Sequence, residues 1–370
     1  MRRLRICLVS PYSWPEVTRG GERYLHDLAW YLAGRGHAVE VLSGTDRAAY
    51  EEVFEGAHFR RLHHRLPRRW AARGTTTFDT FGLVALPFLV RRRFDVVHAL
   101  SATGALAARI AGQRTLYTPL GYPTEDQFGR RPYDRRLFAA GVRAAHVTTA
   151  LSQASARQVE LLLGRRAVCL SPGLRLSNFP ANLEPRSGPP RILFPAFAGD
   201  RRKGVEFLLR AAPAVLDARP DARFQLLGGG DHDWALATLG RDRERVVAAV
   251  DARHVPDIGP YYRDATVLVL PSQHEAFGLV LVEALASGTP VVCSEDGGMP
   301  DVVTSPDIGR LTPFGDVPSL ASAILDVAEL AERPGTATRC AQHARRWDWE
   351  ATVGPAHERL YRAICAEASG

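Results

Sequence analysis

Short apolar runs and amphipathic stretches alternate along the whole chain. In the first half, apolar runs predict β-strands at residues 5–9, 38–42, 94–98, 114–118, 147–151 and 167–170. Between these runs the apolar positions follow a helical period, as in residues 24–35, and Gly36 then marks a helix end. Strand–helix–strand order of this kind predicts parallel sheets with helices packed on their faces.

The same alternation recurs after residues 178–190, a stretch rich in Pro, Ser and Gly that predicts a linker. Further strands are predicted at residues 191–194, 223–227 and 267–270 and after Pro290. We therefore predict an α/β protein with two Rossmann-like domains. Its parts are an N-terminal domain at residues 1–177, the linker, a C-terminal domain at residues 191–345 and a C-terminal helix within residues 346–370.

The segment 267–292 combines several signals in the order strand, polar loop, helix, strand. Glu275 lies in the loop that leaves the carboxyl end of the first strand, which is where open α/β sheets bind ligands. Gly278 lets backbone N–H groups at the helix start approach an anion, and the helix dipole favours negative charge there. Glu283 lies little more than one turn into the helix, so its carboxylate can accept from a diol. The segment predicts a diphosphate site flanked by two carboxylates; a buried βαβ unit with two solvated glutamates is the alternative.

This segment resembles the donor site of the retaining family 4 glycosyltransferases of the GT-B fold. The resemblance rests on Glu275 and Glu283 with seven residues between them, on Phe277-Gly278-Leu279, and on the runs at 286–292 and 297–303. It implies two Rossmann-like domains that face each other across a cleft, an acceptor domain at residues 1–177 and a donor domain at residues 191–345. It also implies a last helix, here within residues 348–361, that crosses back to the first domain.

The resemblance further implies roles for individual residues. Glu275 would hold hydroxyls of the donor sugar, Glu283 the ribose, and the backbone of residues 253–255 the edge of the base. Gly20 and Gly21 resemble the family's glycine-rich first loop, for which a flexible turn is the alternative. The predicted donor-binding residues are Gly20, Gly21, Arg202, Arg253, His254, Val255, Ala276, Phe277, Gly278, Leu279 and Glu283.

Lys203 is the single lysine of a chain that has 46 arginines, and Gly204 follows it in a charged loop after the strand at 191–194. A compact ammonium suits a diphosphate without needing the planar fork of arginine. In the resembling family, a Lys-Gly pair in this loop places the ammonium on the pyrophosphate of the donor. Lys203 and Glu275 are therefore the predicted catalytic residues.

Two positions depart from the pattern of the family. Residues 195–198 occupy the place of a Gly-Arg pair whose arginine shares the diphosphate with the lysine, so Arg201 or Arg202 is predicted to replace that charge. Leu120 stands where the family commonly has a histidine beside the donor sugar. These departures favour, as an alternative, a non-catalytic relative that acts as a binding subunit.

Charge is unevenly distributed, with a net charge of +13 for residues 1–180 and −6 for residues 181–370 within the total of +7. An anionic acceptor or an acidic membrane surface is therefore predicted to meet the first domain. The densest basic stretch, residues 57–73, contains Trp70 and precedes residues 81–90, which we interpret as a buried helix face. A solvated basic face is the alternative. Nucleic acid is not predicted, because no zinc-finger spacing or RNA-binding aromatic motif accompanies the charge.

Other patterns are simple to interpret. No run of about 18 apolar residues predicts a transmembrane helix, and the N-terminus has no signal pattern, so we predict a cytoplasmic protein, peripheral to the inner face of the membrane at most. Five scattered cysteines predict reduced thiols. Asp231-His232-Asp233 is interpreted as helix capping rather than a metal site. No metal and no cofactor other than the donor are expected.

These patterns together predict a retaining glycosyltransferase that moves a sugar from a nucleotide-diphosphate sugar to an acceptor without a metal. Glycosyl transfer requires charge stabilisation on the leaving diphosphate more than it requires a strong base. Attack assisted by the leaving group is what the family implies. A nucleotide-sugar epimerase of similar fold is the alternative from another enzyme class. The sequence predicts neither the base, the sugar, the acceptor nor the oligomeric state.

Overall fold

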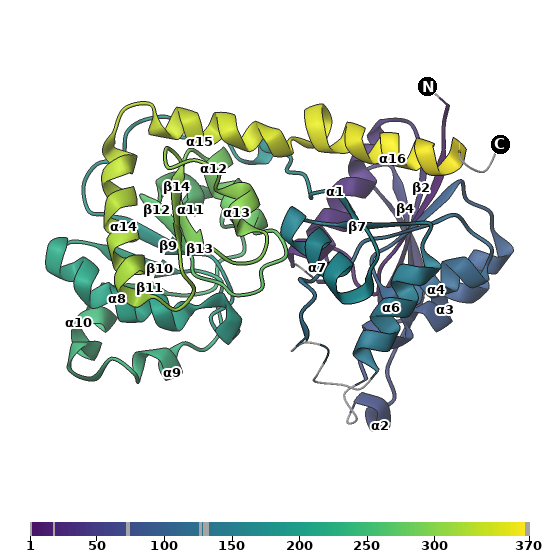
Figure 1. The fold of residues 1–370 in the computed structure, drawn as a ribbon, viewed down its shortest axis with the longest axis horizontal. Helices are drawn as coiled ribbons and strands as arrows, with labels where there is room; N and C mark the ends of the chain where they lie inside the picture. Colours follow the sequence, from purple (N-terminus) through teal and green to yellow (C-terminus); the bar gives the residue numbers. More distant parts are fainter. Residues whose placement is uncertain (1, 18, 72–74, 126–127, 129–132, 367–370) are drawn as a thin grey trace. The chain divides into compact units, whose positions relative to one another are not determined.

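Two α/β units make up the chain, and the computed structural model describes residues 2–17, 19–71, 75–125, 128 and 133–366. Unit 1 consists of Met1–Gly173 together with Asp348–Gly370, and unit 2 consists of Leu174–Trp347. Each unit contains one sheet with helices packed against it (Figure 1).

The sheet of unit 1 has eight strands in the order β3-β4-β2-β1-β5-β6-β7-β8. The strands are β1 (Arg5–Val9), β2 (Ala38–Thr45), β3 (Tyr50–Phe54), β4 (Ala57–His63), β5 (Val96–Ala99), β6 (Thr115–Tyr117), β7 (Val147–Ala150) and β8 (Val168–Cys169). All neighbouring pairs are parallel except β3 with β4. The chain order reverses between β1 and β5, so the two loops that leave these strands define the switch point of the sheet.

Helices cover both faces of this sheet. They are α1 (Gly20–Gly34), α3 (Thr77–Arg91), α4 (Ala102–Ile110), α6 (Asp134–Ala144), α7 (Gln153–Leu163) and α16 (Gly354–Ala366), whereas the short helix α2 (Arg68–Ala71) has no buried residue. Helix α4 begins where Ser101 Oγ accepts from Gly104 N, as expected of a serine N-cap. Cys7 and Val9 pack in a core with α3, α4 and α6, whereas Ile6 and Leu8 alternate with them and are also fully buried. The strand must therefore be apolar on both sides.

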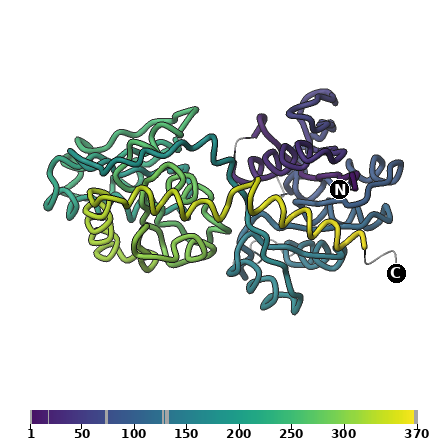
Figure 2. Tube along the Cα trace, turned by 90° about the horizontal axis from the view of Figure 1, so that it is seen from above, coloured from purple at the N-terminus to yellow at the C-terminus, as the bar shows by residue number. Residues whose placement is uncertain are grey.

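The C-terminal helix α16 packs within unit 1 although unit 2 precedes it in the chain (Figures 1 and 2). Tyr361 Oη lies 2.7 Å from His98 Nδ1, and Tyr24 Oη lies 2.9 Å from His357 Nε2. Burial lowers the pKa of His357 to about 4, so this ring is neutral at pH 7. These buried hydrogen bonds, together with the one of 2.8 Å between His37 Nε2 and Glu358 Oε1, hold the helix to the rest of unit 1, as the predicted fold requires.

The sheet of unit 2 has six parallel strands in the order β11-β10-β9-β12-β13-β14. The strands are β9 (Arg191–Phe194), β10 (Arg223–Leu226), β11 (Val250–Ala252), β12 (Val267–Leu270), β13 (Val291–Ser294) and β14 (Gly309–Thr312). The helices are α8 (Val205–Ala218), α9 (Asp233–Leu236), α10 (Arg243–Ala249), α11 (Gly259–Asp264), α12 (Leu279–Ala286), α13 (Met299–Val302), α14 (Val317–Glu332) and α15 (Thr336–Ala344). Chain order reverses between β9 and β12, which is the Rossmann arrangement.

The predicted linker, residues 178–190, is packed on unit 2. Asn182 N donates to Ser287 O at 3.1 Å, and Arg186 Nε donates to Ala265 O at 2.9 Å. The first change of unit falls between Gly173 and Leu174, shortly before this segment. Proline and glycine content indicated irregular backbone here, but hydrogen bonds to the neighbouring loops fix that backbone in place.

The basic stretch 57–73 is not one exposed face. Its first half is β4, which lies between β2 and β3, and its arginines are matched with acids on these neighbours. Arg60 Nε donates to Glu40 at 3.0 Å, and Arg61, only 1% exposed, donates to Glu52 at 2.8 Å. The described arginines of this stretch that remain exposed are Arg65, Arg68 and Arg69, while Arg73 lies outside the described residues.

Two further predictions concern apolar segments and cysteines. Residues 81–90 lie in α3, where Phe81, Ala85 and Leu89 are fully buried, which confirms their interpretation as a core face. The five cysteines are free, and all but Cys169 are buried. Within the described part of the chain, no helix is long and apolar enough to cross a membrane.

Candidate active site

The two predicted catalytic residues meet at the switch point of unit 2. Lys203 follows β9 and Glu275 follows β12, and these strands are parallel neighbours. Lys203 Nζ donates to Glu275 Oε2 at 2.5 Å. The side chains of Lys203 and Glu275 are 28% and 20% exposed, so solvent reaches the pair. An ammonium and a carboxylate are thus presented together at the edge where open α/β sheets bind ligands.

Close backbone packing fixes the Lys203 loop against the Glu275 loop. Gln273 N donates to Arg202 O at 2.7 Å. Gly204 has a φ of +76°, and a Cβ at this position would lie 1.9 Å from Pro271 O. Only glycine meets both conditions, because other residues disfavour this φ and would overlap the carbonyl. The two residues of the Lys-Gly pair therefore act together, because Gly204 permits the close approach to Pro271 O that positions Lys203.

A third loop holds Glu275 from the other side. Gly298 N donates to Glu275 O at 2.8 Å, and a Cβ on Gly297 would lie 2.1 Å from the same oxygen. His274 has a φ of +57°, which is uncommon for a residue other than glycine, and its N–H donates to the Asp296 carboxylate. Backbone held in a sparsely populated region next to a functional side chain is typical of active sites.

Helix α12 begins at this loop. Gly278, with a φ of +93°, is its N-cap, and Ala276 and Phe277 before it are buried. The side chain of Glu283 extends from the second turn and is only 3% exposed. Tyr262 Oη donates to Glu283 Oε2 at 2.6 Å. Tyr262 is fully buried and was not predicted as a site residue, and it orients the carboxylate predicted to hold the ribose.

Neither arginine predicted to replace the missing cation is free of other partners. Arg202 forms two bonds with Asp200, at 2.6 Å from Nη2 to Oδ2 and 3.1 Å from Nε to Oδ1. Burial would raise the pKa of Asp200, but hydrogen bonds from Arg202 and the charges of Arg202 and Lys203 hold it below its usual range. The Arg201 guanidinium carbon lies 4.4 Å from the centre of the Trp234 ring. Binding of an anion by either arginine would therefore compete with these contacts.

An aromatic ring occupies the stretch where the family carries arginine. Phe197 is 56% exposed. A Cβ on Gly199 would lie 2.6 Å from Phe197 Cε1, and a Cβ on Gly230 would lie 2.8 Å from Phe197 Cε2. The two glycines thus let the ring lie flat on the loops after β9 and β10. This position supplies apolar surface rather than charge.

The predicted base-binding residues continue β11 at its carboxyl end. Arg253 N donates to Leu226 O at 2.9 Å, Val255 N donates to Leu227 O at 3.3 Å, and His254 forms an antiparallel bridge with Gly228. These three residues therefore lie beside the turn formed by residues 228–230, all glycine, after β10. Their backbone is fixed by the sheet, as a site for the edge of a base would require.

Asp231 and Asp233 form a local turn. Asp231 Oδ1 accepts from Asp233 N at 2.9 Å where α9 begins. Among the described residues, no group of three His, Cys, Asp or Glu side chains is placed to hold a metal ion.

Gly20 and Gly21 lie in unit 1, where they begin α1. A Cβ on Gly21 would lie 2.8 Å from Leu120 Cδ1, so the predicted glycine loop and the leucine that replaces the family histidine are in direct contact. The contact between Gly21 and Leu120 could not be predicted from the sequence, where the two residues are far apart.

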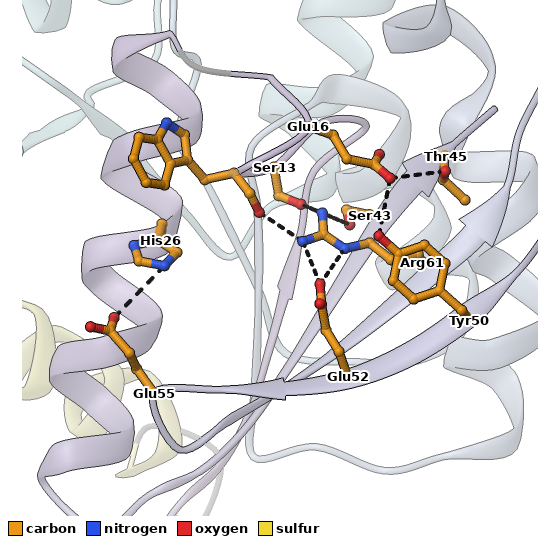
Figure 3. A network of polar contacts seen from close by, with 10 residues as sticks. Ser13, Glu16, His26, Ser43, Thr45, Tyr50, Glu52, Glu55 and Arg61 are labelled. Carbon is orange, nitrogen blue, oxygen red and sulfur yellow. Dashed lines mark hydrogen bonds and ion pairs between the residues drawn. The ribbon is translucent and has the colours of Figure 1, made fainter. Parts of the chain in front are cut away.

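Arg61 anchors the loop that precedes these glycines (Figure 3). Its guanidinium donates to Ser13 Oγ, to Trp14 O at 2.7 Å, to Ser43 Oγ at 3.2 Å and to Glu52 Oε1 at 2.8 Å. This side chain therefore fastens the loop after β1 to β2 and β3. This role of Arg61 was not predicted from the sequence. The signal in the sequence is that Arg61 stands two residues after the buried Phe59 on β4, so both side chains lie on the same, buried face.

Arg61→Met should lower the free energy of unfolding by about 2 kcal/mol, in the range for hydrogen bonds to a charged group. The reason is that Ser13, Ser43 and the Trp14 carbonyl would lose their donor in a buried place. Urea unfolding followed by circular dichroism would measure it. Arg65→Met, an exposed arginine beyond β4, is the control. Equal effects from the two changes would contradict an anchoring role.

Two family models together span most of the chain. Residues 18–177 match Glycosyltransferase Family 4, and residues 189–329 match Glycosyl transferases group 1. The chain belongs to the family 4 glycosyltransferases. It is thus a glycosyltransferase of the type that uses nucleotide sugars, and the site described above lies within the matched regions.

Curated proteins and solved structures are similar to this glycosyltransferase. A phosphatidyl-myo-inositol mannosyltransferase of Mycolicibacterium smegmatis is 27% identical over 395 residues, covering 98% of this chain and 94% of the relative. A D-inositol 3-phosphate glycosyltransferase of Streptomyces avermitilis is 34% identical over 252 residues, covering 62% of this chain and 53% of the relative. The structure of sucrose-phosphate synthase from Thermosynechococcus elongatus superimposes with a TM-score of 0.82 at 23% identity, covering 99% and 100% of the two chains. The predicted GT-B fold is confirmed.

Proposed function

We propose that this protein is a retaining, metal-independent glycosyltransferase that moves a sugar from a nucleotide-diphosphate sugar to an acceptor hydroxyl. The observation that carries the proposal is the Lys203–Glu275 pair at the switch point of unit 2. An ammonium suits the diphosphate of a donor, and the adjacent carboxylate suits the hydroxyls of its sugar. The start of α12, after Gly278, adds backbone amides and the positive end of a helix dipole.

In the proposed reaction, the bond between the anomeric carbon and the diphosphate oxygen breaks. A bond from the acceptor oxygen forms on the same face of the sugar, and the acceptor proton passes to the departing diphosphate. Lys203 and the amides at the start of α12 stabilise the charge that develops on the leaving group. Glu275 positions the sugar, and Glu283, held by Tyr262, binds the ribose.

The test begins with a thermal-shift screen across UDP, GDP, ADP and TDP sugars, because a ligand that binds the folded state raises the melting temperature. The donor that binds is then incubated with and without acceptors, and the products are identified by NMR. A glycosylated acceptor with the donor's anomeric configuration is the expected result. An epimerised donor formed without acceptor would replace the proposal by the isomerase alternative. If a donor binds but no acceptor is glycosylated, the protein would be a non-catalytic binding subunit, and the proposal would be wrong.

Lys203→Ala should weaken nucleoside diphosphate binding by about 1.5–3 kcal/mol, the range for a hydrogen bond to a charged group. Lys203→Arg should also be impaired, because the backbone packing around Gly204 leaves the loop no freedom to accommodate a wider, planar group. Isothermal titration calorimetry measures both.

Arg210→Ala, on the exposed face of α8 in the same unit, is the control for loss of a positive charge. Unchanged affinity in Lys203→Ala would reduce the lysine to a surface residue and remove the main support for the diphosphate site.

A further inference from the structure

One aromatic ring of unit 2 is left largely exposed at the carboxyl edge of the sheet. Phe197 follows β9 and is 56% exposed. Other rings near this edge are covered, because the Phe314 ring lies 5.0 Å from that of Phe207, and the Arg201 guanidinium carbon lies 4.4 Å from the centre of the Trp234 ring. Single apolar side chains are common on protein surfaces, so exposure alone does not indicate a site.

Two glycines determine where the Phe197 ring lies. A Cβ on Gly199 would lie 2.6 Å from Phe197 Cε1, and a Cβ on Gly230 would lie 2.8 Å from Phe197 Cε2. Distances below 3 Å are closer than atoms that are not bonded can approach, so a side chain at either glycine would displace the ring. The exposed ring is therefore seated on backbone and does not project freely into solvent.

The backbone beneath the ring is itself fixed. Ala198 N donates to Gly229 O at 2.8 Å, which joins the loop after β9 to the turn after β10. A Cβ on Gly228 would lie 2.1 Å from Ala196 O, so the loop and the turn approach this closely only because residue 228 is glycine. The ring thus has a defined position before any ligand binds.

The loops follow one another along the sheet in the order of the parts of a nucleotide sugar. Glu275 follows β12, Lys203 follows β9 and Gly230 follows β10, and these strands are consecutive in the sheet. If Glu275 holds the sugar and Lys203 the diphosphate, the nucleoside extends toward β10, where the Phe197 ring lies. Neighbouring strands are about 4.8 Å apart, so the loops after β12 and β10 are separated by about 10 Å, which a diphosphate and a ribose can bridge.

The base is the part of such a donor that suits this ring. Every nucleobase has a π face, and an aromatic side chain can stack on it whichever base is present. Stacking also removes apolar ring surface from water. A diphosphate at the same place would lose water and gain no hydrogen-bond donor from the ring, which is unfavourable.

We propose that Phe197 stacks on the base of the donor nucleotide. The proposal rests on the proposed transferase function and adds a residue that binds the nucleoside part of the donor. Because stacking does not depend on the hydrogen-bonding groups at the edge of the base, Phe197 contributes affinity for any base, and the choice between bases depends on other groups.

Removing the ring tests the proposal on the full chain. The probes are whichever of UDP, GDP, ADP and TDP gives the largest thermal shift, and inorganic pyrophosphate, which has no base. Phe197→Ala should weaken binding of the nucleoside diphosphate about tenfold or more and leave that of pyrophosphate, measured by competition, unchanged. Lys203→Ala should weaken both. Phe54→Ala, at an exposed phenylalanine on β3, is the control and should change neither. Unchanged nucleoside diphosphate binding in Phe197→Ala, or equal weakening of both probes, would overturn the proposal.

Gly199→Ala moves the ring without removing it. The three atoms nearest to a Cβ on Gly199 all belong to the Phe197 ring, so the added methyl group acts mainly on that ring. This variant should weaken nucleoside diphosphate binding, and it should have no further effect when combined with Phe197→Ala. Gly188→Ala, where nothing lies within 4 Å of the Cβ, is its control. Additive losses in the double variant would show a disturbed loop and contradict stacking.

Phe197→Trp keeps a flat ring and supplies a spectroscopic signal. The nucleoside diphosphate should quench the fluorescence of the added tryptophan, whereas pyrophosphate should not. The wild type, with its six tryptophans, gives the background. Equal quenching by pyrophosphate would place the ring at the phosphates and overturn the proposal. Circular dichroism verifies that each variant folds, and Phe197→Trp decides the question if Phe197→Ala does not fold.

Sugar transfer separates this inference from the proposed function. Phe197→Ala should raise the Michaelis constant of the donor about tenfold with little change in turnover, because the stack is present equally in the ground state and the transition state. A higher Michaelis constant for the acceptor alone would assign the ring to the acceptor and overturn the proposal. If none of the four nucleoside diphosphates bound the wild type, the proposed function would be wrong and the stacking with it. If one bound without any transfer, only the proposed function would be wrong.

Discussion

Gly204→Ala should destabilise unit 2 by about 3–5 kcal/mol and abolish measurable nucleoside diphosphate binding. The left-handed φ of +76° alone costs a residue with a side chain roughly 1–2 kcal/mol. The larger part comes from overlap, because a Cβ would lie 1.9 Å from Pro271 O, and that carbonyl belongs to the loop that carries Glu275. Relief requires the two loops to separate, which would move Lys203 away from Glu275.

Gly188→Ala separates the two causes. Gly188 is also in unit 2 and has a φ of +80°, but nothing lies within 4 Å of where its Cβ would be. Its substitution should cost only about 1–2 kcal/mol and leave diphosphate affinity unchanged. Differential scanning calorimetry measures stability, and titration calorimetry measures binding. Similar losses in both variants would show that the close contact with Pro271 does not organise the site.

The positions of Lys203 and Glu275 in loops after strands follow from local sequence alone. Each apolar run of strand length ends in polar residues, and the carboxyl edge of a parallel sheet is where such loops gather. Their ion pair could not be predicted, because the residues are 72 positions apart and meet only if β9 and β12 are neighbours. The same is true of Tyr262 and Glu283, whose hydrogen bond joins two helices.

The β3–β4 hairpin shows where pattern reasoning fails. The basic residues of β4 were interpreted as part of a surface for an anionic acceptor or an acidic membrane, with a solvated basic face as the alternative. The apolar alternation that marks a strand is interrupted by Arg61, whose side chain is buried. A buried arginine is stable only when several partners surround it, and here these come from the loop after β1, from β2 and from β3. The hydrogen bonds of residues 178–190 could not be predicted for a related reason, since composition does not show which backbone groups will find partners in a neighbouring loop.

Glu275→Gln should lower turnover about 10²-fold while nucleoside diphosphate binding stays the same or tightens. The amide keeps the shape of the side chain but removes the charge, so the donor sugar loses a strong acceptor and is misplaced at the reacting centre. The diphosphate, in contrast, no longer competes with a carboxylate that lies 2.5 Å from the Lys203 ammonium. Removing a negative charge from beside an anion site also removes repulsion.

Glu295→Gln provides the matched control, because Glu295 is an exposed glutamate in the neighbouring loop after β13. It should leave both turnover and affinity unchanged. Steady-state kinetics with the donor and titration calorimetry with the corresponding nucleoside diphosphate separate the two effects. If Glu275→Gln weakened diphosphate binding as much as Lys203→Ala does, the carboxylate would serve mainly to position the lysine. If turnover were unchanged, Glu275 would have no part in holding the sugar, and the ion pair at the switch point would be structural.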